Sequence, residues 1–363
     1  MKMRLALVSL KLSVGMELIL TSLADELEGV ADLRILAEKP YRHPRVKTIA
    51  LTDARRYARM ILDTLNPWLW LQLFILGLRE RPERLYLVSS HSLNSAVILT
   101  NRAAARLQGR RIEILSHIHD PIPHSKARFA WAITLSQFLQ VRLSDRVAVF
   151  GAQLKQMLID QTGFAPERVV IYPHPVCREE RTQSPQPASP KFVSLLGRLE
   201  AYKGIDDFLR CAQAFASIDP EVVFVLGGEG DLSPYQESIR MLPNLQVLNR
   251  RLSNEEMDAI FQQSYAALLP YRDGTQSGVI PFAYYNACPV IITRTGSLPE
   301  LVDEGVTGFL VEPRQVEAMV EHLRALVSQP ELRTRMGAAS FAYYRDRLRW
   351  KAAIATLYGL PHS

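Results

Sequence analysis

Two cations follow closely on an apolar run in the second half of the chain. The run Val193–Leu196 leads into Gly197 and Arg198, and Lys203 comes five residues later, where the pattern predicts a helix start. Arginine offers a planar fork of donors to a phosphate, and lysine offers a compact charge. The backbone N–H groups at a helix start add further donors. The spacing therefore predicts a phosphate or diphosphate site, with two solvated surface cations as the alternative.

Three later segments repeat this form of apolar run, turn and helix start: Leu226–Leu232, Leu269–Ile280 and Pro289–Val302. Their candidates for ligand contacts are Gly228 in the first, Asp273, Gln276, Ser277 and Gly278 in the second, and Glu300 in the third. Glycines let a backbone approach a ligand closely, and a polar loop that opens a helix suits an anion. Each segment alone also fits an ordinary strand-to-helix turn.

Candidates in the first half lie at two predicted strand ends. Gly15 opens a helix after the run Arg4–Ser9, and His117, His119 and Asp120 follow an apolar run. We expect His119 to face a cleft and His117 to point to the opposite face of the strand. A metal site formed by the two histidines and Asp120 is the weaker alternative, and we expect no metal.

Apolar runs of strand length alternate with helix-length patterns through both halves. The predicted strands are Arg4–Ser9, Leu85–Ser89, Ile112–Ile118, Arg146–Phe150 and Val169–Tyr172, then Phe192–Leu196, Val222–Leu226, Leu245–Leu248, Ala266–Leu269 and Val290–Thr293. Runs without polar alternation suit strands buried on both faces of a parallel sheet. The alternation predicts an α/β protein of two Rossmann-like, doubly wound parallel-sheet domains that face a cleft.

The stretch 178–190 interrupts this alternation with three prolines among polar residues and reads as a linker. We therefore expect an N-terminal domain at 1–176, a linker at 177–190 and a C-terminal domain at 191–342. Residues 343–363 would form a segment that crosses back to the first domain.

Composition restricts the class of protein further. The 363 residues carry a formal charge of +6 and three scattered cysteines, which favours anionic partners and argues against a disulfide framework. The N-terminus reads as a buried strand rather than a signal peptide. The segment Pro67–Leu78 is apolar but too short to span a bilayer. It reads better as a core helix, with docking on an anionic membrane as the open alternative.

The ordered motifs of the second half resemble a known family. They are Gly-Arg and Lys-Gly within 197–204, Gly-Gly-Glu-Gly-Asp-Leu at 227–232, Gln-Ser-Gly at 276–278, Pro-Val-Ile at 289–291, Pro-Glu-Leu-Val at 299–302 and Thr-Gly-Phe-Leu-Val at 307–311. In this order they look like the family-4 retaining glycosyltransferases of GT-B fold, and like a subgroup with a Gln-Ser-Gly loop. One departure is clear: an acid that usually contacts ribose is replaced near Phe282.

The resemblance assigns roles to the candidates. Arg198 and Lys203 would bind the donor diphosphate beside Gly197, and Ser277 and Gly278 would contact its distal phosphate. His119 would contact the donor sugar or position the acceptor. The remaining donor contacts would come from Gly15, Asp120, Gly228, Asp273, Gln276 and Glu300.

The implied activity is a retaining, metal-independent transfer of a sugar to a hydroxyl acceptor. The donor would be a UDP- or GDP-sugar without a further cofactor, and the product a polysaccharide or glycolipid. A non-catalytic sugar-nucleotide-binding subunit and a sugar-nucleotide epimerase are the alternatives. We expect no nucleic acid partner and a cytoplasmic protein, with contact to the inner face of the membrane as an option. A nicotinamide enzyme is disfavoured because no Gly-x-Gly-x-x-Gly follows the first strand.

Overall fold

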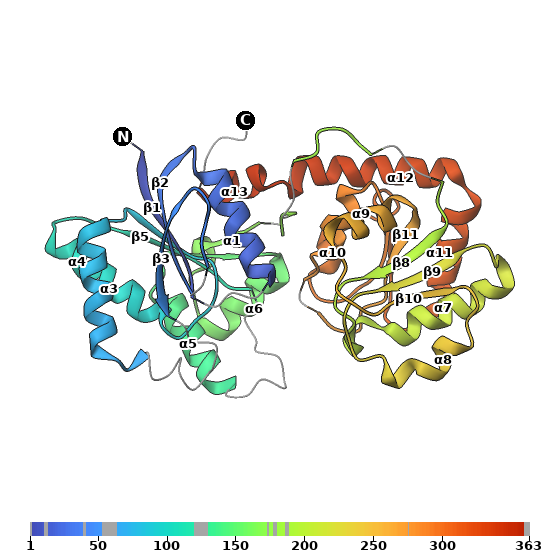
Figure 1. Ribbon diagram of the computed structural model, residues 1–363, viewed down its shortest axis with the longest axis horizontal. Coiled ribbons are helices and arrows are strands. Elements are labelled where there is room, and N and C mark those ends of the chain that lie inside the picture. Colours follow the sequence, from blue (N-terminus) through green and yellow to red (C-terminus); the bar gives the residue numbers. More distant parts are fainter. Residues whose placement is uncertain are drawn as a thin grey trace. The chain divides into compact units, whose positions relative to one another are not determined.

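The computed structural model forms two compact units, Met1–Tyr172 with Ile354–Ser363, and Pro173–Ala353. It describes residues 2–10, 14–38, 41–52, 64–119, 130–172, 174–176, 180–185, 189–274 and 276–358. The last helix, α13 (Trp350–Tyr358), starts in the second unit and ends in the first (Figure 1). There the Arg146 guanidinium donates to the Leu357 carbonyl at 3.1 Å, which ties this helix to the first sheet.

The first unit contains a parallel sheet of seven strands in the order β3-β2-β1-β4-β5-β6-β7. The strands are β1 (Met3–Ser9), β2 (Ala31–Glu38), β3 (Lys47–Thr52), β4 (Arg84–Leu87), β5 (Glu113–His117), β6 (Arg146–Val149) and β7 (Val169–Ile171). Its helices are α1 (Val14–Leu27), α3 (Pro67–Glu80), α4 (Asn94–Leu107), α5 (Ala130–Arg142) and α6 (Ala152–Thr162). The side chains of β1 and β4 pack with α3 and α4 in one core cluster.

The second unit contains a parallel sheet of six strands in the order β10-β9-β8-β11-β12-β13. The strands are β8 (Phe192–Leu196), β9 (Val223–Gly227), β10 (Leu245–Leu248), β11 (Ser264–Leu269), β12 (Val290–Thr293) and β13 (Gly308–Val311). Its α-helices are α7 (Ile205–Ile218), α8 (Gln236–Arg240), α9 (Asn254–Gln262), α10 (Val279–Tyr285), α11 (Val316–Ser328) and α12 (Pro330–Tyr343). Short turns of helix include η2 (Ala201–Lys203), η4 (Leu298–Leu301) and η5 (Tyr344–Leu348).

Both faces of this second sheet are covered, which explains its continuous apolar strands. Val193 and Leu195 pack into a core cluster with α7 and α11, whereas Leu196 packs into another with α9, α10 and α12. Successive side chains of a strand point to opposite faces, so both sets of side chains are buried and most of them are apolar. The predicted α/β class with two parallel sheets is confirmed.

Each sheet has a point at which the strand order reverses. In the first sheet this switch lies between β1 and β4, and in the second between β8 and β11. Open parallel sheets bind ligands at the carboxyl ends of the strands that flank such a switch. In the second unit, the loops after β8 and β11 carry most of the predicted site residues.

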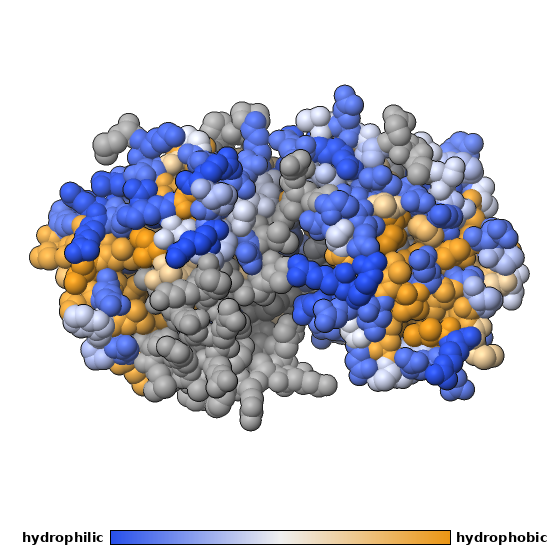
Figure 2. All heavy atoms as spheres, viewed as in Figure 1, coloured by the Kyte–Doolittle hydropathy of each residue, from blue (hydrophilic) through white to orange (hydrophobic). Residues whose placement is uncertain are grey.

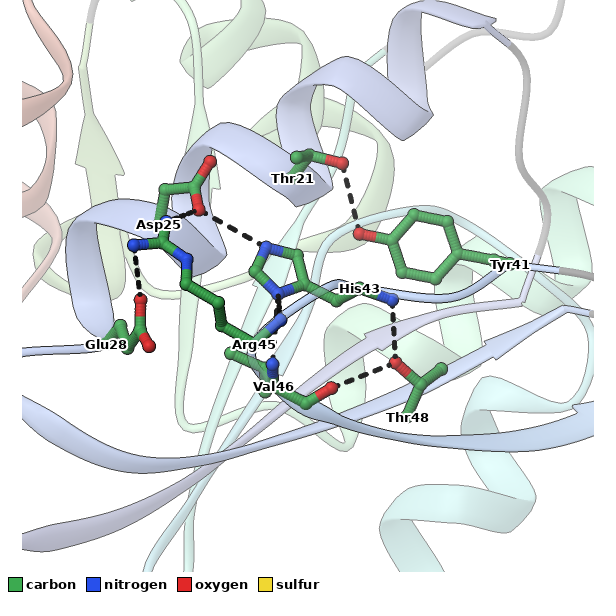
Figure 3. Close-up of polar contacts among 8 residues, drawn as sticks. All are labelled: Thr21, Asp25, Glu28, Tyr41, His43, Arg45, Val46 and Thr48. Carbon is green, nitrogen blue, oxygen red and sulfur yellow. Dashed lines mark hydrogen bonds and ion pairs between the residues drawn. The ribbon is translucent and has the colours of Figure 1, made fainter.

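Residues 41–46 fix α1 against the first sheet (Figure 3). The contacts are Tyr41 with Thr21, His43 with Asp25, and Arg45 with Asp25 and Glu28. Alternate residues of an extended chain thus meet one face of the helix. The His43 Nδ1 atom accepts two backbone N–H groups at 3.2 and 3.1 Å, which leaves the Nε2 proton for Asp25 at 3.3 Å. These contacts of residues 41–46 hold α1 in place, and the first turn of α1 contains Gly15.

Candidate functional site

Lys203 lies at the centre of the residues that the second switch point brings together. Its side chain is buried, and its Nζ atom lies beside Gly197. A Cβ atom on Gly197 would lie 3.0 Å from Lys203 Nζ and 3.3 Å from a methyl group of Val279. Gly197 also has a φ of 102°, which an L side chain rarely adopts. Glycine at this position therefore keeps open the space between Lys203 and the start of α10.

Tyr271 and Ser277 complete this cluster from the loop that follows β11. The ring of Tyr271 lies 5.2 Å from Lys203 Nζ, and its hydroxyl lies 3.4 Å from the buried Ser277 Oγ. Ser277 Oγ accepts the backbone N–H of Val279 at 3.3 Å. An ammonium and a hydroxyl thus converge where the sequence predicted a phosphate site. Sequence reasoning overlooked Tyr271, because its role depends on a contact between two loops.

His174 lies next to the predicted Gly278. A Cβ atom on Gly278 would lie 3.7 Å from His174 Cε1, in ordinary contact. His174 Nδ1 is 2.9 Å from the Pro175 carbonyl, and burial lowers the pKa of the imidazole. The ring therefore stays neutral at pH 7 and adds a hydrogen-bonding group rather than a charge.

Arg198 lies at the rim of the site and not in the cluster. Its side chain is 79% exposed, and its guanidinium pairs with Glu200 at 2.9 Å. It lines a cavity of about 430 Å³ together with Glu229, Asp231 and Tyr235. The two predicted phosphate-binding cations thus differ: Lys203 is held in place, whereas Arg198 has an exchangeable surface partner.

Arg272 connects the two loops that carry the cluster. Its guanidinium donates to the fully buried Asp207 at 3.1 and 2.9 Å and also contacts Asp206. Its backbone N–H donates to the Tyr202 carbonyl at 2.7 Å. Lys203 is therefore fixed relative to the loop that contains Ser277.

The other predicted donor contacts of this unit have different surroundings. Asp273 is exposed and accepts the Gly274 N–H at 2.7 Å, which stabilises its own loop. Gln276 is half-buried, and its Oε1 atom has no hydrogen-bond partner among the described residues. Glu300 is exposed on η4, after β12.

Gly228 has a steric role that differs from the one expected. At this residue, which has a φ of 142°, a Cβ atom would lie 1.8 Å from the Gly197 carbonyl oxygen. The glycine therefore lets the loops after β8 and β9 approach one another, and the close neighbour is the chain itself.

Phe282 lies near the position at which the sequence analysis expected an acid. Its ring is partly buried, with the rings of Phe261 and Tyr285 each at 6.0 Å between centroids. An aromatic side chain in this packing offers no hydrogen bond to a ribose hydroxyl.

The expectation that His117 and His119 face opposite ways is wrong. Their rings lie 4.0 Å apart, because residues two apart in extended backbone share a face. His117 is fully buried, and its Nδ1 atom lies 3.2 Å from the Tyr172 hydroxyl. His119 follows the end of β5 and also contacts the ring of Phe150. Asp120, the other half of the predicted pair, lies outside the described residues.

The switch of the first sheet brings together polar residues that the sequence analysis did not select. Ser9 at the end of β1 donates to Ser89, just after β4, at 3.1 Å. His91 follows in the same loop and is buried, with Nδ1 accepting the Leu93 N–H at 3.1 Å. Their position directly after an apolar run was the signal that could have identified them.

Metal and membrane features can be judged for the described part of the chain. No group of three His, Cys, Asp or Glu residues in it could hold a metal ion. Cys211 and Cys288 are free and buried, and burial raises the pKa of the Cys211 thiol to about 12. No helix within the described ranges has the length and apolar character needed to cross a membrane.

Comparison with known proteins places these features in a family. Residues 177–342 match the model of the glycosyl transferases group 1. Sulfoquinovosyl transferase SQD2 of Arabidopsis thaliana is 24% identical over 72% of this chain and 53% of its own. D-inositol 3-phosphate glycosyltransferase of Corynebacterium glutamicum is 27% identical over 48% of this chain and 44% of its own. The chain thus spans about half the length of these curated relatives.

Solved structures extend the likeness to both units. HepE of Anabaena, in complex with UDP, has a TM-score of 0.72 at 15% identity and covers 99% of this chain and 98% of its own. A sucrose-phosphate synthase from Thermosynechococcus elongatus has a TM-score of 0.71 at 14% identity, with the same coverage. The protein has the GT-B fold, and its residues 177–342 are similar to the group 1, or family-4, glycosyltransferases. The family resemblance seen in the sequence is confirmed.

Proposed function

We propose that the protein transfers a sugar, with retention, from a nucleotide diphosphate sugar to a hydroxyl acceptor. The observation that carries the proposal is the buried cluster of Lys203, Tyr271 and Ser277 beside Gly197, inside the range that matches the family. Sugar transfer from such a donor leaves a nucleoside diphosphate, whose growing charge has to be stabilised. A fixed ammonium and a hydroxyl in one partly desolvated space suit that task.

The roles follow from the positions in the second unit. Lys203 would bind the diphosphate as a fixed charge, and Ser277 with the backbone of Gly278 would bind the distal phosphate. Arg198 would exchange Glu200 for a phosphate oxygen and close over the ligand. Glu300, Gly228, Asp273 and Gln276 stay predicted donor contacts. From the first unit, we assign the donor sugar and acceptor side to His119, Gly15 and Asp120 by family resemblance.

The donor is most directly tested by titration calorimetry of the full chain with UDP, GDP, ADP and UDP-glucose. HepE was solved with UDP and with UDP-glucose, which makes these the first probes. We expect Lys203→Met to weaken the tightest ligand about 10- to 100-fold, the range for losing a charged hydrogen bond. Arg198→Ala should lower the affinity less, because in the unliganded protein Arg198 must give up its contact with Glu200 before it can bind a phosphate.

Lys191→Met is the matched control. Lys191 lies next to the start of β8, at the opposite end of the strand from Gly197, with Nζ over the Phe192 ring at 4.9 Å. The Lys191→Met variant should bind nucleotides with the affinity of the wild type. Equal losses in Lys191→Met and Lys203→Met, or no binding of any of these ligands at millimolar concentration, would overturn the donor-site assignment.

Phe282 favours a second candidate, a non-catalytic sugar-nucleotide-binding subunit. Without the acid of the family pattern, the donor can bind through its phosphates while the nucleoside is held loosely. The two functions differ in turnover: the enzyme releases UDP from UDP-glucose or a related donor when acceptor is added, and the subunit does not. A sugar-nucleotide epimerase would instead change the donor without acceptor.

We also propose contact with an anionic membrane surface through α3. On this helix Trp68, Leu71 and Ile75 are 65%, 44% and 37% exposed, whereas Leu69 and Leu73 are buried. Leu65, just before the helix, is 73% exposed. Figure 2 shows an apolar area over the part of the surface where Figure 1 labels α3 and α4. The last turn of the helix contains Arg79 and ends at Glu80, and the chain carries a net charge of +6. An amphipathic helix of this kind binds anionic lipid through its apolar side chains and basic ends.

Vesicle co-sedimentation tests this contact. The chain should bind vesicles of phosphatidylglycerol and phosphatidylcholine, and bind less to phosphatidylcholine alone. Trp68→Ser should lower binding several-fold, whereas Met241→Ser, an exposed apolar residue of the second unit at 77%, should not. Equal binding of both variants would argue against α3 as the contact.

A further inference from the structure

We propose that Tyr271 is a positioning residue that couples Lys203 to Ser277 and keeps the lysine charge free for the ligand. The inference rests on the proposed function of this site. Tyr271 lies two residues after the end of β11, which pairs with β8 at the switch point, and its side chain is 1% exposed. Its ring, its hydroxyl and its carbonyl each have a separate contact.

The ring holds Lys203 without neutralising it. A buried ammonium is costly unless it is compensated, and an aromatic face 5.2 Å away supplies a cation–π attraction. Tyr202 packs edge-on against the same ring at 6.0 Å and 83°. A carboxylate partner would bind the lysine more strongly and quench its charge. Arg272, the residue after Tyr271, is paired in this other way, because its guanidinium contacts both Asp206 and Asp207.

The hydroxyl links the ring to the serine. Tyr271 Oη lies 3.4 Å from Ser277 Oγ, which already accepts the Val279 N–H. The serine proton is therefore directed either to Tyr271 or to a bound anion. Displacement of Tyr271 would move the lysine and the serine together.

The carbonyl anchors the residue to a third strand. Thr293, the last residue of β12, and Thr295 both donate their hydroxyl groups to the Tyr271 carbonyl oxygen, the latter at 3.1 Å. Backbone and side chain are thus fixed independently, as pre-organised binding requires.

The experiment is titration calorimetry of the full chain with UDP and UMP, for wild type, Tyr271→Phe, Tyr271→Leu, Ser277→Ala and the double variant Tyr271→Phe/Ser277→Ala. We expect about a 3-fold loss of UDP affinity in Tyr271→Phe, which keeps the ring, and about 10-fold or more in Tyr271→Leu. The double variant should bind no more than about 2-fold weaker than Ser277→Ala, because both changes remove one shared contact. The ratio of UDP to UMP affinity should fall in Tyr271→Leu.

Tyr265 provides the matched control. It lies on the same strand, β11, and its ring lies 5.2 Å from the Arg333 guanidinium, outside the described site. Tyr265→Phe and Tyr265→Leu should lower UDP affinity less than 2-fold. Circular dichroism and thermal unfolding confirm that each variant is folded, and if Tyr271→Leu is not, Tyr271→Phe and the double variant still decide.

The outcomes separate the two claims. Wild-type affinity in folded Tyr271 variants, additive losses in the double variant, or equal losses in the Tyr265 variants would overturn the coupling alone. If the wild type binds neither UDP nor UMP, nor GDP or ADP as substitutes, the proposed function fails and the coupling fails with it.

Discussion

Arg272→Ala should destabilise the second unit strongly, because a buried carboxylate loses both of its guanidinium hydrogen bonds and keeps only the exposed Arg210, at 3.8 Å, as a cationic neighbour. Asp207 is fully buried and accepts two guanidinium hydrogen bonds, at 3.1 and 2.9 Å. Burial alone would lower the pKa of Arg272, but the hydrogen bonds and charges of Asp207 and Asp206 outweigh it and raise the pKa. Removing one partner of a buried pair costs about 3–5 kcal/mol. The Arg272 side chain is 30% exposed, so we expect the variant to lose about 2–3 kcal/mol of the free energy of unfolding.

Calorimetric unfolding of the full chain measures this loss. A change of about 2–3 kcal/mol in a unit of this size lowers the midpoint of its transition by roughly 5–10 °C. The double variant Arg272→Ala/Asp207→Asn should recover at least half of the lost midpoint at pH 7.

The surface pair of Arg250 and Glu256 is the control for this argument. It also has two guanidinium hydrogen bonds, at 2.9 and 2.6 Å, here one to each carboxylate oxygen, but both side chains are solvent-exposed. Arg250→Ala should shift the midpoint far less than Arg272→Ala. Similar shifts in the two variants would refute the claim that burial of Asp207 sets the cost.

Three further predictions concern stability. Ala287 has a φ of 54°, so Ala287→Gly should stabilise the second unit by about 0.5–1 kcal/mol and raise its thermal midpoint, as relief of left-handed strain outweighs the added freedom of the unfolded chain. Gly228→Ala should cost about 3 kcal/mol or more and abolish nucleotide binding, because its Cβ would meet the Gly197 carbonyl; near-wild-type midpoint and affinity would contradict this. The hydrogen bonds from Arg250 and the Ser253 backbone lower the pKa of Glu256 to about 2, so this stabilisation is complete above the usual pKa near 4.5 and is lost as the pH falls through about 2. The difference in unfolding midpoint between wild type and Glu256→Gln should therefore disappear over that pH range.

The secondary structure could be predicted wherever one pattern of apolar residues dominated a segment of the sequence. Strands such as β8 and β12 are apolar at all but one position and were predicted with the bounds observed. β2 and β3 were not predicted, because β2 carries Asp32 and Arg34, which pair with one another at 2.6 Å, and β3 is an edge strand with Lys47. Paired charges remove the apolar signal on which the prediction depends.

The site could be predicted only as a set of strand ends. The segments around Lys203 and Ser277 were found because each follows an apolar run, but their contact depends on β8 pairing with β11. The sequence contains no local signal for that pairing, and therefore none for Tyr271, whose ring in the loop after β11 contacts Lys203 from the loop after β8. The histidine pair was predicted wrongly for a simpler reason. His117 and His119 are two residues apart, and residues at this spacing in extended backbone point to the same face.

Phe282 and the cluster of Lys203, Tyr271 and Ser277 together indicate which end of the donor this unit binds more tightly. The phosphate end has a held ammonium, a hydroxyl and the open space beside Gly197, whereas the position of the ribose acid has an aromatic ring packed on Phe261 and Tyr285. Binding energy should then come mainly from the diphosphate, because charged hydrogen bonds are stronger than neutral ones. UDP, GDP and ADP should therefore bind within about 10-fold of one another, and each much more tightly than its nucleoside. Strong preference for one base would place the specificity outside this cluster and would mean that Phe282 is a recognition surface rather than a lost contact.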